Sequence, residues 1–178
     1  MAEGTILVVG TSRRDGNTYG LLQRANKGVG FPVVDVSELR ISFFDYHARN
    51  LEDDFIPTIE KLLRYDTIGL VSPVYWYSLS AQLKTFIDRF ADLLGPRKDL
   101  GRQLKGKRLF LLATGSTDEQ LPSCMEEMVR LTAGYMEMEY LGAHYSRFLR
   151  ELDFEPETVA GAARFLASMS RCQGDPAP

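Results

Sequence analysis

The feature that most constrains the fold of this chain is a regular alternation of short apolar segments and helical patterns. Residues 5–10, 67–71 and 108–114 are nearly continuous apolar runs, which are typical of strands buried on both faces of a sheet. We predict two further strands, over 31–36 and near 139–145. Apolar residues at helical spacing follow each strand, and they predict helices over about 18–27, 55–64, 79–94, 121–135 and 156–169.

This alternation predicts an α/β protein with three layers. Strands joined through helices run parallel, and such crossovers are right-handed, so the helices cover both faces of the sheet. Five strands in a chain of 178 residues fit the doubly wound order 2-1-3-4-5 better than a six-stranded order. No repeat or change of composition divides the chain, so we predict one domain over 1–172 and a frayed tail over 173–178.

Composition excludes several classes of function. The chain is 44% hydrophobic and 25% charged, and its net charge is −3, with no dense run of Lys and Arg. We therefore expect no nucleic-acid partner. No apolar segment is long enough for a membrane helix, and Met1 to Gly4 lead directly into the first strand without a signal sequence, so we expect a cytoplasmic protein without a membrane partner. Cys124 and Cys172 have neither redox nor metal spacing, so we expect no metal site.

A ligand of a doubly wound sheet binds beyond the carboxyl ends of the strands, where the strand order reverses. In the order 2-1-3-4-5 that point lies between the first and third strands, so the loops after them are the candidate site. The first loop, residues 10–18, combines hydroxyl and amide side chains with two arginines before a helix. A helix start with such side chains suits a phosphate group. The alternative is a capping loop in which Asn17 or Thr18 only caps the helix.

The second loop contains three consecutive aromatic residues, Tyr75, Trp76 and Tyr77. Three neighbouring rings at the end of a strand cannot all face the core, so we expect at least one to be exposed and able to stack on a flat ligand. We place Trp76 at the site, whereas core packing remains an alternative for Tyr75 and Tyr77. A third loop, residues 114–118, follows the fourth strand at the same edge, and its glycine permits close approach of a ring.

Other polar residues fit structural roles better. Lys84 and Asp88 are spaced as an ion pair on one helix, and with Arg89 we assign them to structure or to a subunit contact. Neither His47 nor His144 has a carboxylate or cysteine at a spacing typical of a catalytic or metal site, so we expect each to be a solvated or core histidine. The connection over 37–53 has no clear pattern, and we expect the basic segment 97–107 to be a surface loop.

Residues 10–18 resemble the phosphate loop of the family of NADPH-dependent FMN reductases and flavodoxin-like NAD(P)H oxidoreductases. Residues 72–89 are similar to the second signature of that family, a Pro-x-Tyr loop followed by a Lys…Asp-Arg helix. The resemblance implies a flavodoxin-like fold, FMN as cofactor and NAD(P)H as co-substrate. The region after the second strand lacks the cysteine cluster of the iron–sulfur members, so we exclude an iron–sulfur centre.

The resemblance also implies which residues hold FMN, and together with the loops it gives one candidate set. No side chain is assigned a catalytic role, because the cofactor carries the chemistry. The candidate cofactor-binding residues are Thr11, Ser12, Arg14, Gly16, Asn17, Thr18, Pro73, Val74, Tyr75, Trp76, Tyr77, Ser78, Thr114, Gly115 and Ser116.

The expected function is an FMN-dependent oxidoreductase that takes hydride from NAD(P)H and reduces a quinone, a flavin or a similar small acceptor. The alternative is a flavodoxin-type electron carrier without nicotinamide turnover. A flavin-free domain on the same fold also stays open, because a fold does not fix a function. We expect a homodimer or tetramer, with a subunit contact on the helix over 79–94, whose apolar residues exceed what one sheet face needs.

Overall fold

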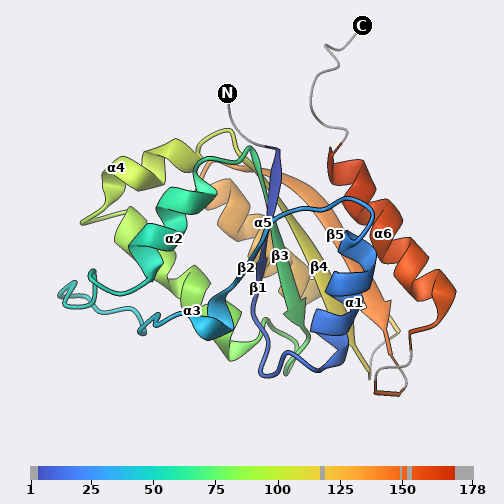
Figure 1. Ribbon diagram of the computed structural model, residues 1–178. Coiled ribbons are helices and arrows are strands. Elements are labelled where there is room, and N and C mark those ends of the chain that lie inside the picture. Colours follow the sequence, from blue (N-terminus) through green and yellow to red (C-terminus); the bar gives the residue numbers. More distant parts are fainter. Residues whose placement is uncertain (1–3, 117–118, 149, 152–153, 171–178) are drawn as a thin grey trace, which may run out of the picture.

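The computed structural model describes residues 4–116, 119–148, 150–151 and 154–170. Its centre is a five-stranded sheet of order β2-β1-β3-β4-β5 in which every neighbouring pair is parallel. The predicted flavodoxin-like order is therefore confirmed. In Figure 1 the arrowheads of the strands point to one edge of the sheet. The strands are β1 (Thr5–Val9), β2 (Val33–Asp35), β3 (Thr67–Pro73), β4 (Arg108–Gly115) and β5 (Glu139–Arg147).

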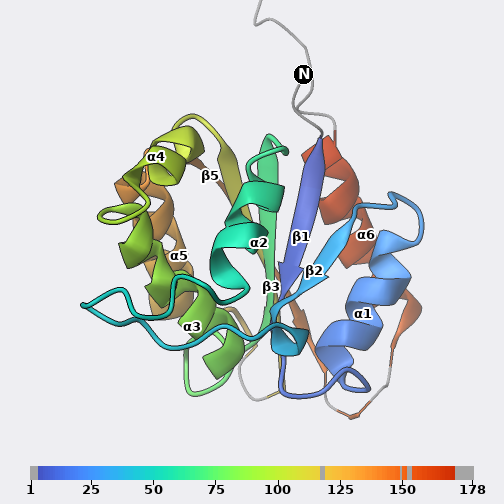
Figure 2. The same ribbon diagram turned by 60° about the vertical axis from the view of Figure 1, so that its left-hand side comes forward.

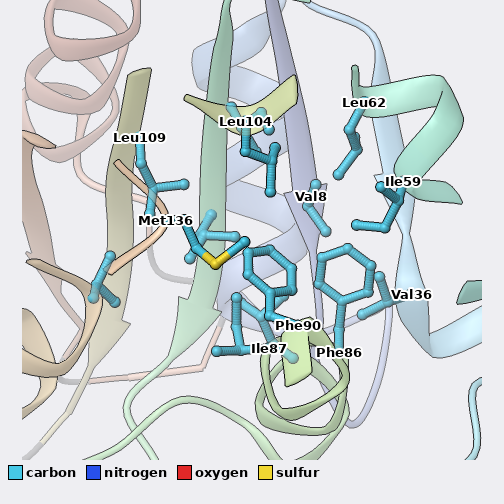
Figure 3. Close-up of a cluster of buried hydrophobic side chains, with 14 of the residues drawn as sticks. Val8, Val36, Ile59, Leu62, Phe86, Ile87, Phe90, Leu104, Leu109 and Met136 are labelled. Atoms are coloured by element: carbon cyan, nitrogen blue, oxygen red, sulfur yellow. The ribbon is translucent and has the colours of Figure 1, made fainter. Parts of the chain in front are cut away.

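Helices cover both faces of the sheet, as the alternation predicts (Figure 2). On one face lie α1 (Asn17–Asn26) and α6 (Pro156–Ser170), and on the other lie α2 (Phe55–Leu62), α3 (Ala81–Asp88) and α5 (Ser123–Tyr135). Successive strand residues point to opposite faces, so Leu7 packs under α1 and α6 while Val8 packs under α2 and α3. Figure 3 shows this second core, with Phe86 and Phe90 stacked edge to face beneath Val8 and Ile59.

The expected helix over 79–94 is shorter in the structure. α3 ends at Asp88, and residues Arg89–Leu93 form a 3-10 turn. The side chain of Arg89 is fully buried within this turn and donates to the Asp92 carboxylate, three residues further along, at 2.6 Å. A contact between residues three positions apart fits the tighter 3-10 helix. The apolar residues continue through this turn, so their spacing alone overestimates the length of α3.

The basic segment 97–107 is not simply a surface loop, which corrects the expectation from sequence. It contains a short helix, α4 (Lys98–Gly101), and a 3-10 turn (Arg102–Leu104). Leu100 and Leu104, four positions apart, are buried in the core, whereas Lys98, Arg102 and Lys105 are exposed. The segment is too short for this amphipathic period to stand out in the sequence.

The predicted tail, residues 173–178, lies outside the described residues. Within the described part of the chain, none of the helices has the length and apolar character needed to cross a bilayer.

Candidate functional site

A cleft of about 160 Å³ opens at the carboxyl edge of the sheet, between the loops after β1, β3 and β4. This is the switch point of the sheet, because β1 lies between β2 and β3. Its volume is below the roughly 300–1,000 Å³ of typical ligand sites, so it encloses only part of a nucleotide-sized ligand. The lining residues are Thr11, Arg13, Gly16, Asn17, Thr18, Pro73, Val74, Tyr75, Thr114, Gly115, Ser116 and Phe148.

The first wall of the cleft is the start of α1. The helix is capped by Gly16, which has no side chain to accept from the first turn. The first N–H groups of a helix have no acceptor within the helix, and they carry the positive end of its dipole. Asn17 and Thr18 of this turn line the cleft. This geometry suits an anion such as the phosphate group expected from the sequence.

Hydroxyl groups fix the loop that precedes this helix. Ser37 donates to the carbonyl of Thr11 at 2.8 Å and accepts from its N–H at 3.1 Å. The hydroxyls of Thr18 and Thr114 lie 2.6 Å apart and join α1 to β4. Ser80 donates to the carbonyl of Gly10 at 2.8 Å, so the loops after β1 and β3 are held together. Sequence reasoning missed Ser37 and Ser80, which come from elements other than the phosphate loop.

The two arginines of the loop point in different directions. Arg13 lines the cleft and forms an ion pair with Glu151. Arg14 does not line the cleft; it pairs with Asp35 at 3.2 Å and with Glu38, and it donates to the Tyr19 hydroxyl at 2.8 Å. This hydrogen bond raises the pKa of Arg14. Arg14 therefore ties the loop to the end of β2, whereas Arg13 is placed for a ligand.

The aromatic loop is a tight turn with an unusual backbone. Tyr75 and Ser78 exchange two main-chain hydrogen bonds of 3.0 and 3.1 Å, and the two residues between them have positive φ, 49° for Trp76 and 64° for Tyr77. Such a pair defines a type I′ turn, which normally contains Asn and Gly. For larger residues the left-handed conformation costs roughly 1–2 kcal/mol each.

Contacts on both sides hold this turn in place. The N–H of Val74 donates to the carbonyl of Thr114 at 2.7 Å, and the Cys124 thiol donates to the carbonyl of Tyr77 at 3.3 Å. Trp76 is 93% exposed, so the turn presents its ring to solvent. Tyr77 and Tyr75 are also exposed, so the alternative that they pack in the core is wrong.

The third wall is built by the end of β4. A Cβ atom at Gly115 would lie 2.3 Å from the Tyr145 hydroxyl, so any larger residue would have to displace the Tyr145 side chain. Phe148 donates its N–H to the carbonyl of Gly115 at 2.8 Å, and its ring lines the cleft. Phe148 follows β5 at the same edge of the sheet, and this position is the signal by which sequence reasoning could have found it.

The structure thus brings most of the candidate residues together. Thr11, Gly16, Asn17 and Thr18 meet the residues from both later loops, whereas five of the predicted residues do not line the cleft: Ser12, Arg14, Trp76, Tyr77 and Ser78. Trp76 to Ser78 belong to the turn that begins at Tyr75, so they border the cleft. Among the described residues, no three His, Cys, Asp or Glu side chains form a group that could hold a metal ion.

The shape and chemistry of the cleft fit FMN. One end has a helix start, three polar side chains and an arginine, which suit a single phosphate group. The other end has the main chain of two loops and an exposed aromatic turn, which suit a flat ring with a polar edge. The loop after β1 packs closely on α3, because a Cβ atom at Gly10 would lie 2.8 Å from the Leu83 Cβ.

Comparison with known proteins agrees with this geometry. The model of a family described as NADPH-dependent FMN reductase matches residues 5–148, which include all three walls of the cleft. YwqN of Bacillus subtilis (strain 168), provisionally named an NAD(P)H-dependent FMN-containing oxidoreductase, is 28% identical over 125 residues, which is 65% of this chain and 68% of that protein.

Solved structures share the fold. The Trp repressor binding protein from Bacillus subtilis superposes with a TM-score of 0.72 at 22% identity, over 96% of this chain and 99% of that one. An NADPH-quinone reductase from P. pentosaceus superposes with a TM-score of 0.69 at 18% identity, over 98% of this chain and 100% of that one. General stress protein 14 from Treponema denticola, solved in complex with FMN, superposes with a TM-score of 0.67 at 15% identity, over 94% of this chain and 98% of that one.

Proposed function

We propose that this chain, which belongs to the NADPH-dependent FMN reductase family, takes hydride from NAD(P)H and reduces a quinone, a flavin or a similar small acceptor. The observation that carries the proposal is one cleft in which a helix start faces an exposed aromatic turn, at the switch point of the sheet. The first feature binds phosphate, and the second leaves room for a second flat molecule beside the flavin.

The residues divide into two groups by the part of FMN that they would hold. The N-terminal turn of α1 and the side chains of Thr11, Arg13, Asn17 and Thr18 would bind the phosphate. The main chain of Pro73 to Tyr75 and of Gly115 and Ser116 would contact the ring, since these residues line the other part of the cleft. Bound FMN would supply the redox chemistry, namely hydride acceptance from nicotinamide and electron transfer to the acceptor.

The protein's own contribution is position and access. The bonded Thr18 and Thr114 hydroxyls and the Ser80–Gly10 hydrogen bond keep the three loops at fixed spacing. The exposed aromatic turn beside the cleft would leave nicotinamide and then the acceptor free to approach the ring. No proton relay is required of the side chains around the ring.

We also propose a homodimer with a contact along α3 and α5. These helices border a groove of about 270 Å³, and Leu94, Leu131 and Tyr135 are exposed in or beside it. Exposed apolar residues that gather beside a groove mark an interaction site more often than scattered ones do. The position agrees with the subunit contact expected on the helix over 79–94.

The decisive experiment uses the purified protein and three readouts. A reductase binds FMN with the absorbance of an oxidised flavin and oxidises NAD(P)H rapidly when a quinone or free flavin is present. An electron carrier binds FMN but does not oxidise NAD(P)H by itself. A protein that binds no FMN at micromolar concentration would overturn the proposed function.

A further inference from the structure

The positive charge of the cleft comes from one residue. Among the described residues that line the cleft, Arg13 alone has a charged side chain. Its side chain lies against the N-cap of α1, since a Cβ atom at Gly16 would be 3.2 Å from the Arg13 Nε. The guanidinium is thus beside the helix start, where a phosphate group would bind.

This charge is already balanced within the protein. The Arg13 guanidinium forms an ion pair with the Glu151 carboxylate, and its Nε lies 3.9 Å from a carboxylate oxygen of Asp15. Arg14, the other arginine of the loop, is occupied by Asp35 and Glu38. Four carboxylates therefore surround two arginines, which leaves the phosphate loop without a net positive charge.

Glu151 reaches the loop because Arg150 and Glu151 lie beside the start of α1. Phe148 at the end of this strand lines the cleft, and the carbonyl of Arg150 accepts from the Asn17 side chain at 3.4 Å. Glu151 follows directly and meets Arg13. The fold therefore brings Glu151 to the phosphate loop, where both side chains of its ion pair with Arg13 are partly exposed.

We propose that Glu151 is a specificity-determining residue that competes with the phosphate of FMN for Arg13, an inference that rests on the proposed function. A phosphate dianion that binds the helix start has to replace the Glu151 carboxylate as the partner of Arg13. It then lies near that carboxylate, which carries the same sign of charge. Unphosphorylated flavin meets no such competition. Glu151 thus reduces the preference of the cleft for FMN over riboflavin, and it makes bound FMN easier to exchange.

The test compares FMN and riboflavin binding to the full-length protein, by flavin fluorescence titration, in the wild type and in Glu151→Gln. Glutamine retains the size of the side chain but removes the charge. We expect FMN to bind about threefold to fivefold more tightly to the variant, which is the size of an exposed ion pair. Riboflavin affinity should not change, and high salt should reduce the difference because both charges are exposed.

Two further variants make the result specific. Glu137→Gln removes one exposed carboxylate beside the start of β5, at the opposite edge of the sheet, and it should leave FMN affinity unchanged. In an Arg13→Gln background, Glu151→Gln should no longer improve FMN binding. Unchanged or weaker FMN binding in Glu151→Gln, or an improvement that persists without Arg13, would overturn the inference. Absence of FMN binding in the wild type would instead overturn the proposed function.

Discussion

The guanidinium of Arg89 lies 2.5 Å from the carboxylate of Asp53, although the two residues are 36 positions apart. The same guanidinium donates to the carbonyls of Ser42 at 3.1 Å and Asn50 at 3.3 Å. It therefore ties the long connection between β2 and α2 to the end of α3. The structure thus confirms a structural role for Arg89. Lys84 and Asp88, which lie five residues and one residue before Arg89, form only a partly exposed ion pair.

Removal of Arg89 should destabilise the protein strongly. In Arg89→Leu the carboxylates of Asp53 and Asp92 lose their partner while both stay largely buried. Loss of one member of a buried ion pair costs about 3–5 kcal/mol. Urea unfolding followed by circular dichroism measures this change. Lys84→Ala, which breaks the exposed pair on the same helix, serves as the control and should cost less than about 0.5 kcal/mol.

The two arginines of the phosphate loop should differ in their effect on FMN. Arg13→Ala removes the charged side chain that lines the cleft and should weaken FMN binding by about tenfold or more, since a charged hydrogen bond contributes roughly 1.5–3 kcal/mol. Arg14→Ala should weaken it by less than about threefold, because Arg14 faces Asp35 and Glu38. Titration with FMN measures both, and the reverse order of effects would contradict the assignment of Arg13.

The sequence predicts the fold of this protein well because both of its signals are local. Continuous apolar runs such as 67–71 and 108–114 locate the buried strands, and helical spacing locates the helices. The strand order follows from topology, and it places the three loops of the cleft at one edge. The same reasoning finds Asn17 and Thr18, at the start of the helix after β1, and Gly115, at the end of β4.

The details that sequence reasoning misses depend on contacts between distant segments. Arg13 and Arg14 are neighbours, and only the positions of Glu151 and Asp35 decide which of them faces the cleft. The conformation of the connection over 37–53 likewise depends on Arg89, which lies far along the chain and donates to the Ser42 carbonyl. No local pattern contains this information, because the partners meet only after the sheet has formed.

The proposed dimer should dissociate when a charge is placed in the groove between α3 and α5. Tyr135 is 73% exposed and lines this groove, so Tyr135→Glu should not disturb the core of the subunit. Burial of an unpaired carboxylate in a subunit contact is unfavourable, and we expect a shift from dimer to monomer. Sedimentation velocity at micromolar concentration measures the shift. A wild type that is already monomeric would contradict the proposed contact, and Tyr46→Glu, on a different surface, is the control.

Stability should decrease in mild acid because of His144. Burial, and then the charge of Arg164, lower the pKa of His144 below its usual value of about 6.5. The unfolded chain therefore binds a proton more readily than the folded chain. The stability contributed by the neutral ring is present above the unfolded pKa and is lost as pH falls from about 6.5 through the folded pKa. In His144→Gln, urea unfolding at several pH values should show a weaker decrease across this range, and an unchanged decrease would contradict this role.

Trp76 should report on the ligand and contribute little to folding. It is the single tryptophan of the chain, and at 93% exposure it has few contacts to lose. FMN binding should quench its fluorescence strongly if the turn borders the ring. Trp76→Ala should change the unfolding free energy by less than about 1 kcal/mol, since exposed substitutions rarely exceed about 0.5 kcal/mol in either direction.

The same variant separates the two roles open to this side chain. The phosphate end of the cleft contains Arg13 and the start of α1, so Trp76→Ala should leave FMN affinity within about threefold, because a charged phosphate contact contributes most of the binding. Its effect should fall on the KM for NAD(P)H or for the acceptor, which would stack beside the turn. Tyr46→Ala, at an aromatic residue that is 91% exposed on the connection after β2, is the matched control and should leave these constants unchanged. If Trp76 is instead covered by a second subunit, its truncation would cost about 3–5 kcal/mol and leave the kinetics intact, and this outcome would show that the turn serves assembly and not the cofactor.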